Sequence, residues 1–529
     1  MRLAFPRFGT RLLSISCIAT SLVFAQQPPP NRPPGLPGPS PQRPDNQLDT
    51  QLREVIETQG LIPVDATVPS PEDPKVQLGK HLFYTKNLGG EKDAACVSCH
   101  HPVLGGGDGL SLSVGVGAIN SLGEDDPDLL GQGRNPSAND DNNVRHLPNV
   151  PRHAPTFFNL AFLENALFWD GRVSRLPDGA ITTPEGVAAG DAPPVDPRYE
   201  PGTSLAVAQA HLPVTSTTEM RGDFLQAQDN DTLRAALSGR LAGEAPSEPT
   251  LWQTLFGEAF GDDTIDYRRV AEALASYEQS ALFVNSPWQR YLQGDDRALS
   301  QQQKQGALLF FNFPQDGGAG CVACHNGPAF TDQRFHLVGF PQWGPGTDEA
   351  TGQDIGREAV TGNPADRYHF RTPSLLNVGV TAPYGHAGAY ATLREVVQHY
   401  TNPAGNIARL FRDNENAPFC QLAQVRDVIE LSQVSCEALQ QPAHQHSRDV
   451  IEQLEMARSG EAVATSPLPV DASLGRRQVG DLVAFLHALT DPCTQDRACL
   501  QPWILDANDE ATFPDNQMLV PHDQFGNGL

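Results

Sequence analysis

Apolar residues recur at helical spacing in two segments that lie far apart in the chain. In each segment they return every three or four residues, the spacing of one buried helix face. A shorter apolar segment that begins with glycine lies upstream of each, and the second follows a capping box of Ser300 with Gln303. We therefore expect a short helix and a longer closing helix in each half. The short helices cover 79–83 and 306–310, and the closing helices are marked by Val270, Leu274, Tyr277 and Ala281 and by Val479, Leu482, Leu486 and Leu489.

The first 25 residues have the pattern of an export signal. Three early arginines precede a short apolar stretch, Leu12–Phe24, and Ala25 suits cleavage by a signal peptidase. A membrane anchor is the alternative, but the apolar stretch is shorter than the roughly 20 residues that a span needs. We predict a signal peptide over 1–25, a flexible Pro- and Gln-rich linker over 26–47, and an exported, periplasmic protein without a membrane span.

Length and charge limit the further possibilities. A chain of 529 residues is too long for one core, because single cores stop growing at roughly 250–300 residues. The 47 glycines and 46 prolines exceed the roughly 12% share that these residues usually hold, which predicts long ordered loops. The formal net charge of −26 makes nucleic-acid binding improbable, because phosphate contacts need Lys and Arg. A cationic or neutral partner agrees better with this charge.

Four cysteines lie in two identical frames, Cys96-Val97-Ser98-Cys99-His100 and Cys321-Val322-Ala323-Cys324-His325. Cys-x-x-Cys-His is the attachment signature of c-type haem: the thiols add to the vinyl groups, and the histidine binds the iron. A zinc site would need a second Cys-x-x-Cys nearby, and a thioredoxin-like redox pair would not need histidine in both frames. We therefore predict two covalently bound haem c groups, each held by two cysteines and one histidine of its frame.

The other four cysteines of the mature chain pair by proximity in an oxidising compartment. We expect disulfides between Cys420 and Cys436 and between Cys493 and Cys499. Their role is structural, because they staple loops of a Pro-rich C-terminal region.

The two frames head two related halves. Arg152-His153-Ala154-Pro155-Thr156, then Asn159, follows the first frame, and Arg371-Thr372-Pro373-Ser374, then Asn377, follows the second. We expect a mainly α fold with two c-type cytochrome domains in tandem and long Gly/Pro-rich loops. The predicted parts are an N-terminal domain with the first haem (48–290), a C-terminal domain with the second haem (291–490) that carries an insertion (403–470), and a tail (491–529).

Over roughly residues 70–500 the chain resembles the bacterial di-haem cytochrome c peroxidases and their relative MauG. The resemblance is carried by Gly106-Gly107-Asp108-Gly109, Phe168-Trp169-Asp170-Gly171-Arg172, Glu219-Met220, Cys324-His325-Asn326-Gly327-Pro328-Ala329-Phe330-Thr331-Asp332 and Thr381-Ala382-Pro383-Tyr384-Gly385-His386. The segment from Asp491 to Leu500 matches less specifically the tail of larger members. In this family one haem binds hydrogen peroxide and the other stores or relays electrons. The resemblance implies that the haem of the N-terminal domain (48–290) is peroxidatic and that the haem of the C-terminal domain (291–490) transfers electrons.

The resemblance makes the second axial ligand of each haem informative, since a haem that reacts with peroxide needs an open iron position. The histidine that closes the first haem in typical di-haem peroxidases is Val116 here, so we expect an open first haem, as in MauG. His146 and His153 are the alternatives that would close it. At the place of the second haem's usual methionine stands Tyr400, a ligand type found in MauG; otherwise His399 or no side chain binds.

Glu219 matches the family's distal glutamate, which moves a proton between the two oxygens of the peroxide. An exposed loop glutamate is the alternative. The family's glutamine four residues earlier is Thr215 here, so distal hydrogen bonding differs. Trp169 matches the tryptophan between the haems, which gives an electron path, and it also suits a buried aromatic of the core.

The family often holds a calcium ion between its domains, through an asparagine side chain and backbone carbonyls. Thr381 and Pro383 match the carbonyl positions, but His153 replaces the asparagine. Imidazole is a poor ligand for a hard cation. The resemblance therefore allows calcium without making it expected.

These residues predict an exported di-haem peroxidase that reduces hydrogen peroxide with electrons from a redox protein such as a c-type cytochrome. Three alternatives remain: MauG-like, peroxide-dependent oxidation of a partner protein; a non-catalytic di-haem electron-transfer protein; and an oxygenase that uses O₂ on an organic substrate.

Overall fold

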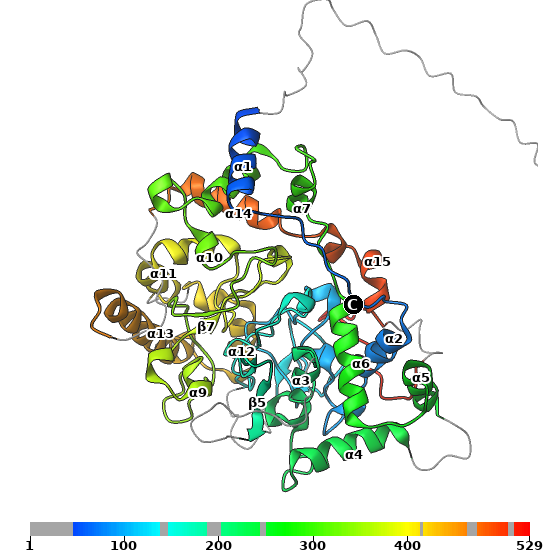
Figure 1. Ribbon diagram of the computed structural model, residues 1–529. Coiled ribbons are helices and arrows are strands. Elements are labelled where there is room, and N and C mark those ends of the chain that lie inside the picture. The colour runs from blue at the N-terminus through cyan, green and yellow to red at the C-terminus, as the bar shows by residue number, and fades with distance from the viewer. Residues whose placement is uncertain are drawn as a thin grey trace, which may run out of the picture. The chain divides into compact units, whose positions relative to one another are not determined.

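Two helix pairs organise the computed structural model of Figure 1, and one helix of each pair packs against the short turn of a Cys-x-x-Cys-His frame. The structure describes residues 46–137, 146–187, 203–243, 250–412, 416–462, 473–505 and 513–529. These residues belong to one compact unit. The predicted signal peptide (1–25) lies outside the described residues, as does the predicted linker (26–47) up to Asn46, where the first helix begins.

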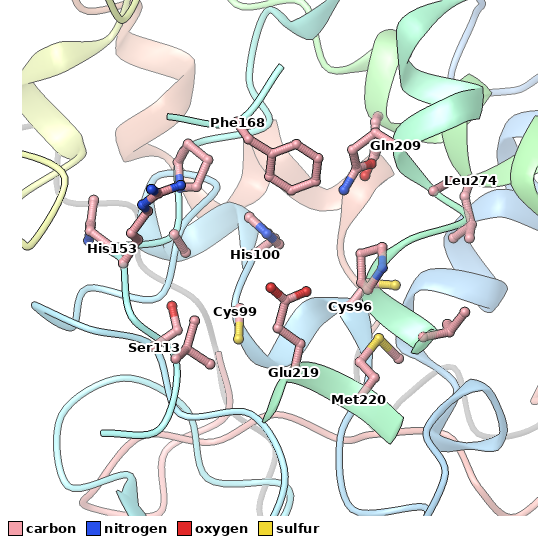
Figure 2. A pocket seen from close by; sticks show the side chains of 18 of the residues that line it. Cys96, Cys99, His100, Ser113, His153, Phe168, Gln209, Glu219, Met220 and Leu274 are labelled. Atoms are coloured by element: carbon pink, nitrogen blue, oxygen red, sulfur yellow. The ribbon is translucent and has the colours of Figure 1, made fainter. Parts of the chain in front are cut away.

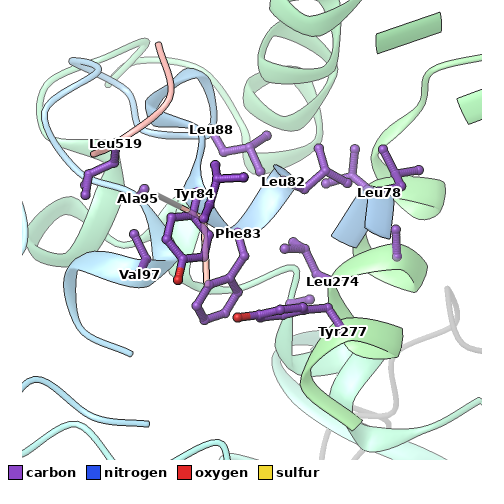
Figure 3. Packing of buried hydrophobic residues seen from close by; sticks show 14 of the residues in the cluster. Leu78, Leu82, Phe83, Tyr84, Leu88, Ala95, Val97, Leu274, Tyr277 and Leu519 are labelled. Atoms are coloured by element: carbon purple, nitrogen blue, oxygen red, sulfur yellow. The ribbon is translucent and has the colours of Figure 1, made fainter. Parts of the chain in front are cut away.

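The first pair consists of α2 (Pro74–Tyr84) and α6 (Tyr267–Ser280), which confirms both helices expected in the first half. The two helices approach closely at Gly79. A Cβ at this position would collide with the backbone of α6 and would lie 2.8 Å from the Cβ of Tyr277. The rings of Phe83 and Tyr277 then pack with their centroids 4.8 Å apart (Figure 3). A glycine therefore lets the aromatic residues of the pair interlock.

The second pair, α8 (Gln301–Phe311) and α14 (Arg476–His487), repeats this arrangement. The predicted capping box is present, because the Ser300 side chain accepts from the third helical residue, whose side chain accepts from the Ser300 N–H. A Cβ at Gly306 would collide with the backbone of α14 and lie 2.8 Å from the Cβ of Phe485. The same close crossing thus occurs in both halves.

The N-terminal helix of the described chain packs in the core of the second half, and the C-terminal segment packs in the core of the first half. Helix α1 (Asn46–Thr58) packs on α8, and its Leu52 is fully buried in the hydrophobic core of the second half. Helix α15 (Arg497–Leu500) and the residues after it contribute Trp503 and Leu519 to the core beside α2 and α6. The domain limits near residues 290 and 490 stay predictions.

The other helices range from single turns to the 24 residues of α13, and the expectation of a helix-rich chain is confirmed. The other α-helices are α3 (Leu205–Gln209), α4 (Asn230–Ala242), α5 (Leu251–Phe260), α7 (Pro287–Leu292), α9 (Glu358–Thr361), α10 (Leu393–Thr401), α11 (Pro403–Leu410), α12 (Ala423–Ser432) and α13 (Cys436–Ser459). The strands pair antiparallel as β1 (Ala118–Ile119) with β2 (Asn135–Pro136), β4 (Val173–Arg175) with both β3 (Ala166–Leu167) and β5 (Ile181–Val187), and β6 (Phe335–His336) with β7 (Phe370–Arg371).

Both predicted disulfides are present, Cys420 with Cys436 and Cys493 with Cys499. The first joins the start of α13 to the turn before α12, inside the predicted insertion (403–470). None of the helices in the described ranges combines the length and the apolar character that crossing a membrane requires.

Candidate active site

The first Cys-x-x-Cys-His frame begins in a short helical turn, η2 (Cys96–Ser98), packed against α2. Cys96 and Cys99 carry free thiols. The Nδ1 of His100 donates to the carbonyl oxygen of Gly106 at 3.3 Å, and burial lowers the pKa of this imidazole. Because Nδ1 carries the proton of that bond, the lone pair of Nε2 stays free to bind iron.

The second frame has the same construction, with its turn at η8 (Cys321–Ala323). Cys321 and Cys324 carry free thiols. The Nδ1 of His325 donates to the carbonyl oxygen of Phe330 at 3.1 Å, and burial lowers the pKa of the imidazole to about 4. A neutral imidazole with a free Nε2 is again the form that binds a metal.

The repeated segments 152–159 and 371–377 each bind the loop whose carbonyl oxygen accepts from the frame histidine. The hydroxyl of Thr156 donates to the carbonyl oxygen of Gly105 at 2.6 Å. The hydroxyl of Ser374 donates to the carbonyl oxygen of Ala329 at 2.7 Å. In each half this carbonyl directly precedes the one that accepts from the frame histidine. The two halves therefore share even the hydrogen bonds that orient the two imidazoles.

A pocket lies beside the first frame and brings several predicted site residues together (Figure 2). It contains about 900 Å³ of space not filled by protein atoms, part of it open to solvent. Its lining includes the frame residues Cys96, Cys99 and His100 together with Glu219 and Trp169. The pocket thus combines two thiols, an imidazole and a carboxyl group.

Glu219 extends into this pocket from η6 (Thr217–Arg221), a single turn of π-helix (Figure 2). The hydroxyl of Ser216 caps the turn by accepting from the Glu219 N–H at 3.2 Å. Burial raises the pKa of the carboxyl group, and the charge of Arg172, whose Nη2 lies 3.8 Å from Oε1, opposes that shift. A half-buried carboxyl group with a raised pKa is suited to accept and return a proton.

Trp169 lies at the boundary between the pocket and the second half of the chain. Its side chain lines the pocket, and its indole N–H donates to the carbonyl oxygen of His153 at 2.9 Å. Its own carbonyl oxygen accepts from the N–H of Arg371 in β7 at 2.7 Å. The residue is therefore fixed on both sides.

Tyr400, on α10, is half-buried and lies close to the second frame. Burial raises the pKa of its phenol above the usual 10, and the nearby Cys324 and Cys321 sulfurs raise it further. The neighbouring His399 uses both ring nitrogens within the protein: Nδ1 accepts from the Tyr390 hydroxyl at 2.8 Å, and Nε2 donates to a backbone carbonyl at 2.9 Å. His399 therefore has no nitrogen left for a metal.

Three positions that the sequence analysis considered lie outside the pocket lining: Val116, His146 and Thr215. The hydroxyl of Thr215 donates to Glu185 and to a backbone carbonyl. Gln209, at the end of α3, lines the pocket instead, and its side chain makes no hydrogen bond to any described residue (Figure 2). Gln209 could not be predicted from the sequence, because a single glutamine carries no spacing signal and only packing places it in one pocket with Glu219.

His153 also lines the pocket, but its ring is already bonded. Its Nδ1 donates to the carbonyl oxygen of Leu110 at 2.8 Å, and its main-chain N–H donates to His386 at 2.8 Å. This bond leaves the lone pair of Nε2 unused, as in His100, so His153 stays an alternative ligand of the first haem, whereas imidazole is a poor ligand for calcium. Only the backbone carbonyls of Thr381 and Pro383 match the family's calcium positions, so the resemblance still allows calcium without making it expected.

Comparison with known proteins agrees with this construction. Residues 73–297 match the family described as di-haem cytochrome c peroxidase. The chain is 30% identical over 368 residues to cytochrome-c peroxidase IdrP1 of Pseudomonas sp. (strain SCT), covering 64% of this chain and 76% of that protein. It is 28% identical over 374 residues to the methylamine utilization protein MauG of Methylophilus methylotrophus, covering 70% and 85%.

The fold is also similar to a solved structure, that of a MauG-like protein associated with microbial copper homeostasis. The TM-score is 0.51 at 21% sequence identity, over 84% of this chain and 97% of that one.

The cofactor that this family implies, haem c, fits the side chains present. Each frame offers two free thiols and an imidazole with a free Nε2, and the first frame opens into a pocket. The chain therefore belongs to the di-haem cytochrome c peroxidase family and is an oxidoreductase of the peroxidase type.

Proposed function

We propose that the protein is an exported di-haem peroxidase that reduces hydrogen peroxide with electrons from a small redox protein such as a c-type cytochrome. One peroxide molecule, two protons and two electrons give two water molecules. The carboxyl group of Glu219, in one pocket with the His100 imidazole and the two thiols of its frame, carries this proposal. When bound covalently there, haem supplies the iron at which peroxide is reduced.

Glu219 moves the proton. Its carboxylate takes a proton from one oxygen of the peroxide and returns it to the other, which leaves as water. Gln209 supplies the amide that the family's glutamine would supply from the position of Thr215, since its side chain lines the same pocket. Access for peroxide is supported by Val116, which stands where typical relatives have a histidine and lies outside the pocket lining.

Electrons enter at the second frame, because it is the more exposed of the two. In the first frame Val97 is fully buried and Ser98 is 1% exposed. In the second frame Ala323 is exposed, and the neighbouring Phe313 is 42% exposed. The acidic chain favours a donor with a positive surface. Trp169, fixed between the pocket and β7, offers an aromatic ring on the way to the first frame.

Export is part of the same proposal. It is supported by the signal-like pattern of residues 1–25, by two haem-attachment frames and by two disulfides, which persist in oxidising compartments.

A second candidate, MauG-like oxidation of a partner protein, is favoured by Tyr400. No methionine stands at its position, and the phenol lies close to Cys321 and Cys324. An anionic oxygen ligand stabilises oxidised iron better than a thioether does. Such a site favours storage of an oxidising equivalent.

The test is peroxide consumption by the purified haem-loaded protein with a reduced c-type cytochrome, compared with the variant Glu219→Gln. We expect Glu219→Gln to lower kcat by about 10²- to 10⁴-fold, because the amide cannot shuttle a proton. The matched control is Glu358→Gln, which changes another glutamate that pairs with an arginine but lies outside the pocket.

Two outcomes would contradict the proposal. Wild-type protein that consumes no peroxide with reduced cytochrome, but oxidises a partner protein when peroxide is added, would replace it with the second candidate. Cytochrome oxidation with no peroxide consumption at all would indicate an electron-transfer protein.

A further inference from the structure

Arg172 lies beside Glu219 and takes no part in the proton transfer described above. Its guanidinium carbon is 3.6 Å from the centroid of the Phe168 ring, and both side chains line the pocket. Its Nη2 is 3.8 Å from Glu219 Oε1, too far for a hydrogen bond, and its Nη1 donates to Asp170 Oδ2 at 3.4 Å. The other N–H groups of the guanidinium make no hydrogen bond to any residue that the structure describes. A permanent positive charge with unused donors therefore faces the pocket.

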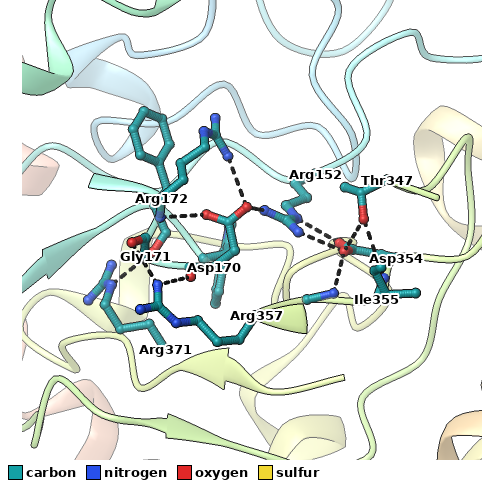
Figure 4. Close-up of polar contacts among 12 residues, drawn as sticks. Arg152, Asp170, Gly171, Arg172, Thr347, Asp354, Ile355, Arg357 and Arg371 are labelled. Atoms are coloured by element: carbon teal, nitrogen blue, oxygen red, sulfur yellow. Dashed lines mark hydrogen bonds and ion pairs between the residues drawn. The ribbon is translucent and has the colours of Figure 1, made fainter. Parts of the chain in front are cut away.

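A buried ion-pair network holds this arginine in place (Figure 4). Asp170, which is 4% exposed, accepts from Arg152 Nη1 at 2.5 Å, and Arg152 also forms two bonds of 2.6 and 2.7 Å to Asp354. The positive charge of Arg152 and Arg172 keeps the pKa of Asp170 well below its usual range despite burial. Arg357 donates to the carbonyl oxygens of Asp170 and Gly171 at 2.8 and 2.7 Å.

The residue that stacks on Arg172 is fixed as well. Phe168 has a φ of 64°, a left-handed conformation that is unfavourable for a bulky residue. The Nε of Arg371 donates to its carbonyl oxygen at 3.0 Å and so stabilises this conformation. The segment 168–172 is thereby preorganised by side chains of the second half, and the Arg172 guanidinium is held over one face of an aromatic ring.

We propose that Arg172 is a further catalytic residue of the peroxide reaction, donating hydrogen bonds to the oxygen that leaves while Glu219 transfers the proton. The inference rests on the proposed function. When the O–O bond breaks, its electron pair stays on the outer oxygen, which receives the proton carried by Glu219 and departs as water. Arg172 gains and loses no proton and no electron; it stabilises the negative charge that forms on that oxygen.

The charge of Arg172 also acts on Glu219 itself. Burial alone would keep the carboxyl group protonated to higher pH, and the guanidinium opposes this effect. The guanidinium therefore favours the carboxylate form of Glu219, which is the form that accepts the first proton of the peroxide. Fixed donors aimed at developing charge are typically the larger contribution to such catalysis.

The experiment compares Arg172→Gln and Arg172→Lys with the wild type, using fluoride binding to the ferric haem-loaded protein and the kcat for peroxide. Fluoride is a small anion that needs hydrogen-bond donors in the pocket, and its optical titration requires no turnover. We expect Arg172→Gln to weaken fluoride binding by at least about tenfold and to lower kcat by about 10²- to 10³-fold. Arg172→Lys, which keeps the charge but not the planar donors, should lie between the two.

The matched control is Arg367, which pairs with Glu358, lies over the Tyr368 ring and has an exposed side-chain fraction of 29% against 27% for Arg172. Arg367→Gln should leave both measurements unchanged. Fluoride affinity and kcat within about twofold of the wild type in both Arg172 variants would overturn the inference and leave the peroxidase proposal standing. If Arg172→Gln loses fluoride affinity but the wild-type protein does not turn over peroxide, only the peroxidase proposal is contradicted.

Discussion

Glu278, on α6, shows how burial alone changes the chemistry of a side chain at the pocket wall. It lines the pocket and is 9% exposed, and its Oε2 has no hydrogen-bond partner among the described residues. Burial raises the pKa of its carboxyl group from the usual 4.5 to about 8. The side chain is therefore protonated and neutral at neutral pH, because an unpaired charge there would be costly.

This shift predicts a specific loss of stability as pH rises. Between pH 4.5 and about 8 the folded protein keeps the Glu278 proton while the unfolded chain releases it, so each pH unit lowers the free energy of unfolding by up to about 1.4 kcal/mol. Glu278→Gln removes this contribution. We expect its Tm to fall less than that of the wild type between pH 5 and pH 8, measured by thermal unfolding. Parallel curves for the two proteins would show that Glu278 is charged in the fold.

The residues of the Cys-x-x-Cys-His frame can be predicted from the sequence, whereas other residues of the pocket cannot. Cys96, Cys99 and His100 are recognisable because their spacing is the signature of c-type haem attachment. Gln209 and Glu278 carry no such constraint, and each reaches the pocket from a different helix. Only the packing of those helices brings them there.

Among the elements, the helix pairs α2–α6 and α8–α14 depend on one glycine each. At Gly79 and Gly306 the backbones approach so closely that no Cβ fits. The apolar spacing of the closing helices predicts which face is buried. It does not predict the crossing point, which the absence of a side chain decides.

Gly306→Ala should therefore destabilise the protein although alanine is the better helix former. Overpacking at such a contact costs about 1–3 kcal/mol, against a gain of roughly 0.5–1 kcal/mol in helix propensity. The control is Gly239→Ala in α4, where a Cβ would meet nothing within 4 Å and should stabilise the protein. Differential scanning calorimetry measures both changes, and an equal rise in Tm for the two variants would refute the close crossing.

For the molecule as a whole, two frames with the same construction are placed in different surroundings. The first lies in a buried turn beside the pocket, whereas the second is more exposed and lies near Tyr400. A vacant and a closed iron differ in spin state, so the asymmetry can be measured directly.

We expect the ferric protein to show one high-spin and one low-spin haem by paramagnetic resonance, and Tyr400→Phe to alter only the low-spin signals. Tyr390→Phe is the matched control, because it removes the hydrogen bond to His399 and should leave both sets of signals unchanged. Two low-spin haems at rest would contradict an open first site. Low-spin signals that respond to Tyr390→Phe and not to Tyr400→Phe would assign the ligand to His399.

The sequence by itself determined the parts of this protein that follow from local spacing. These are the two Cys-x-x-Cys-His frames, the four helices of the two halves, the short-range disulfides and the repeated segments around Thr156 and Ser374. Each depends on residues that lie close together in the chain, so periodicity or a fixed interval reveals it.

The tertiary structure alone decided what depends on contacts between distant segments. Leu52, near the N-terminus, packs in the core of the second half, and Trp503, near the C-terminus, packs in the core of the first half. Asp354 of the second half binds Arg152, which also binds Asp170. Asp170 in turn accepts a hydrogen bond from Arg172, beside Glu219. No fixed residue spacing marks such contacts, because a buried charge needs a partner that is close in space and can lie at any distance along the chain.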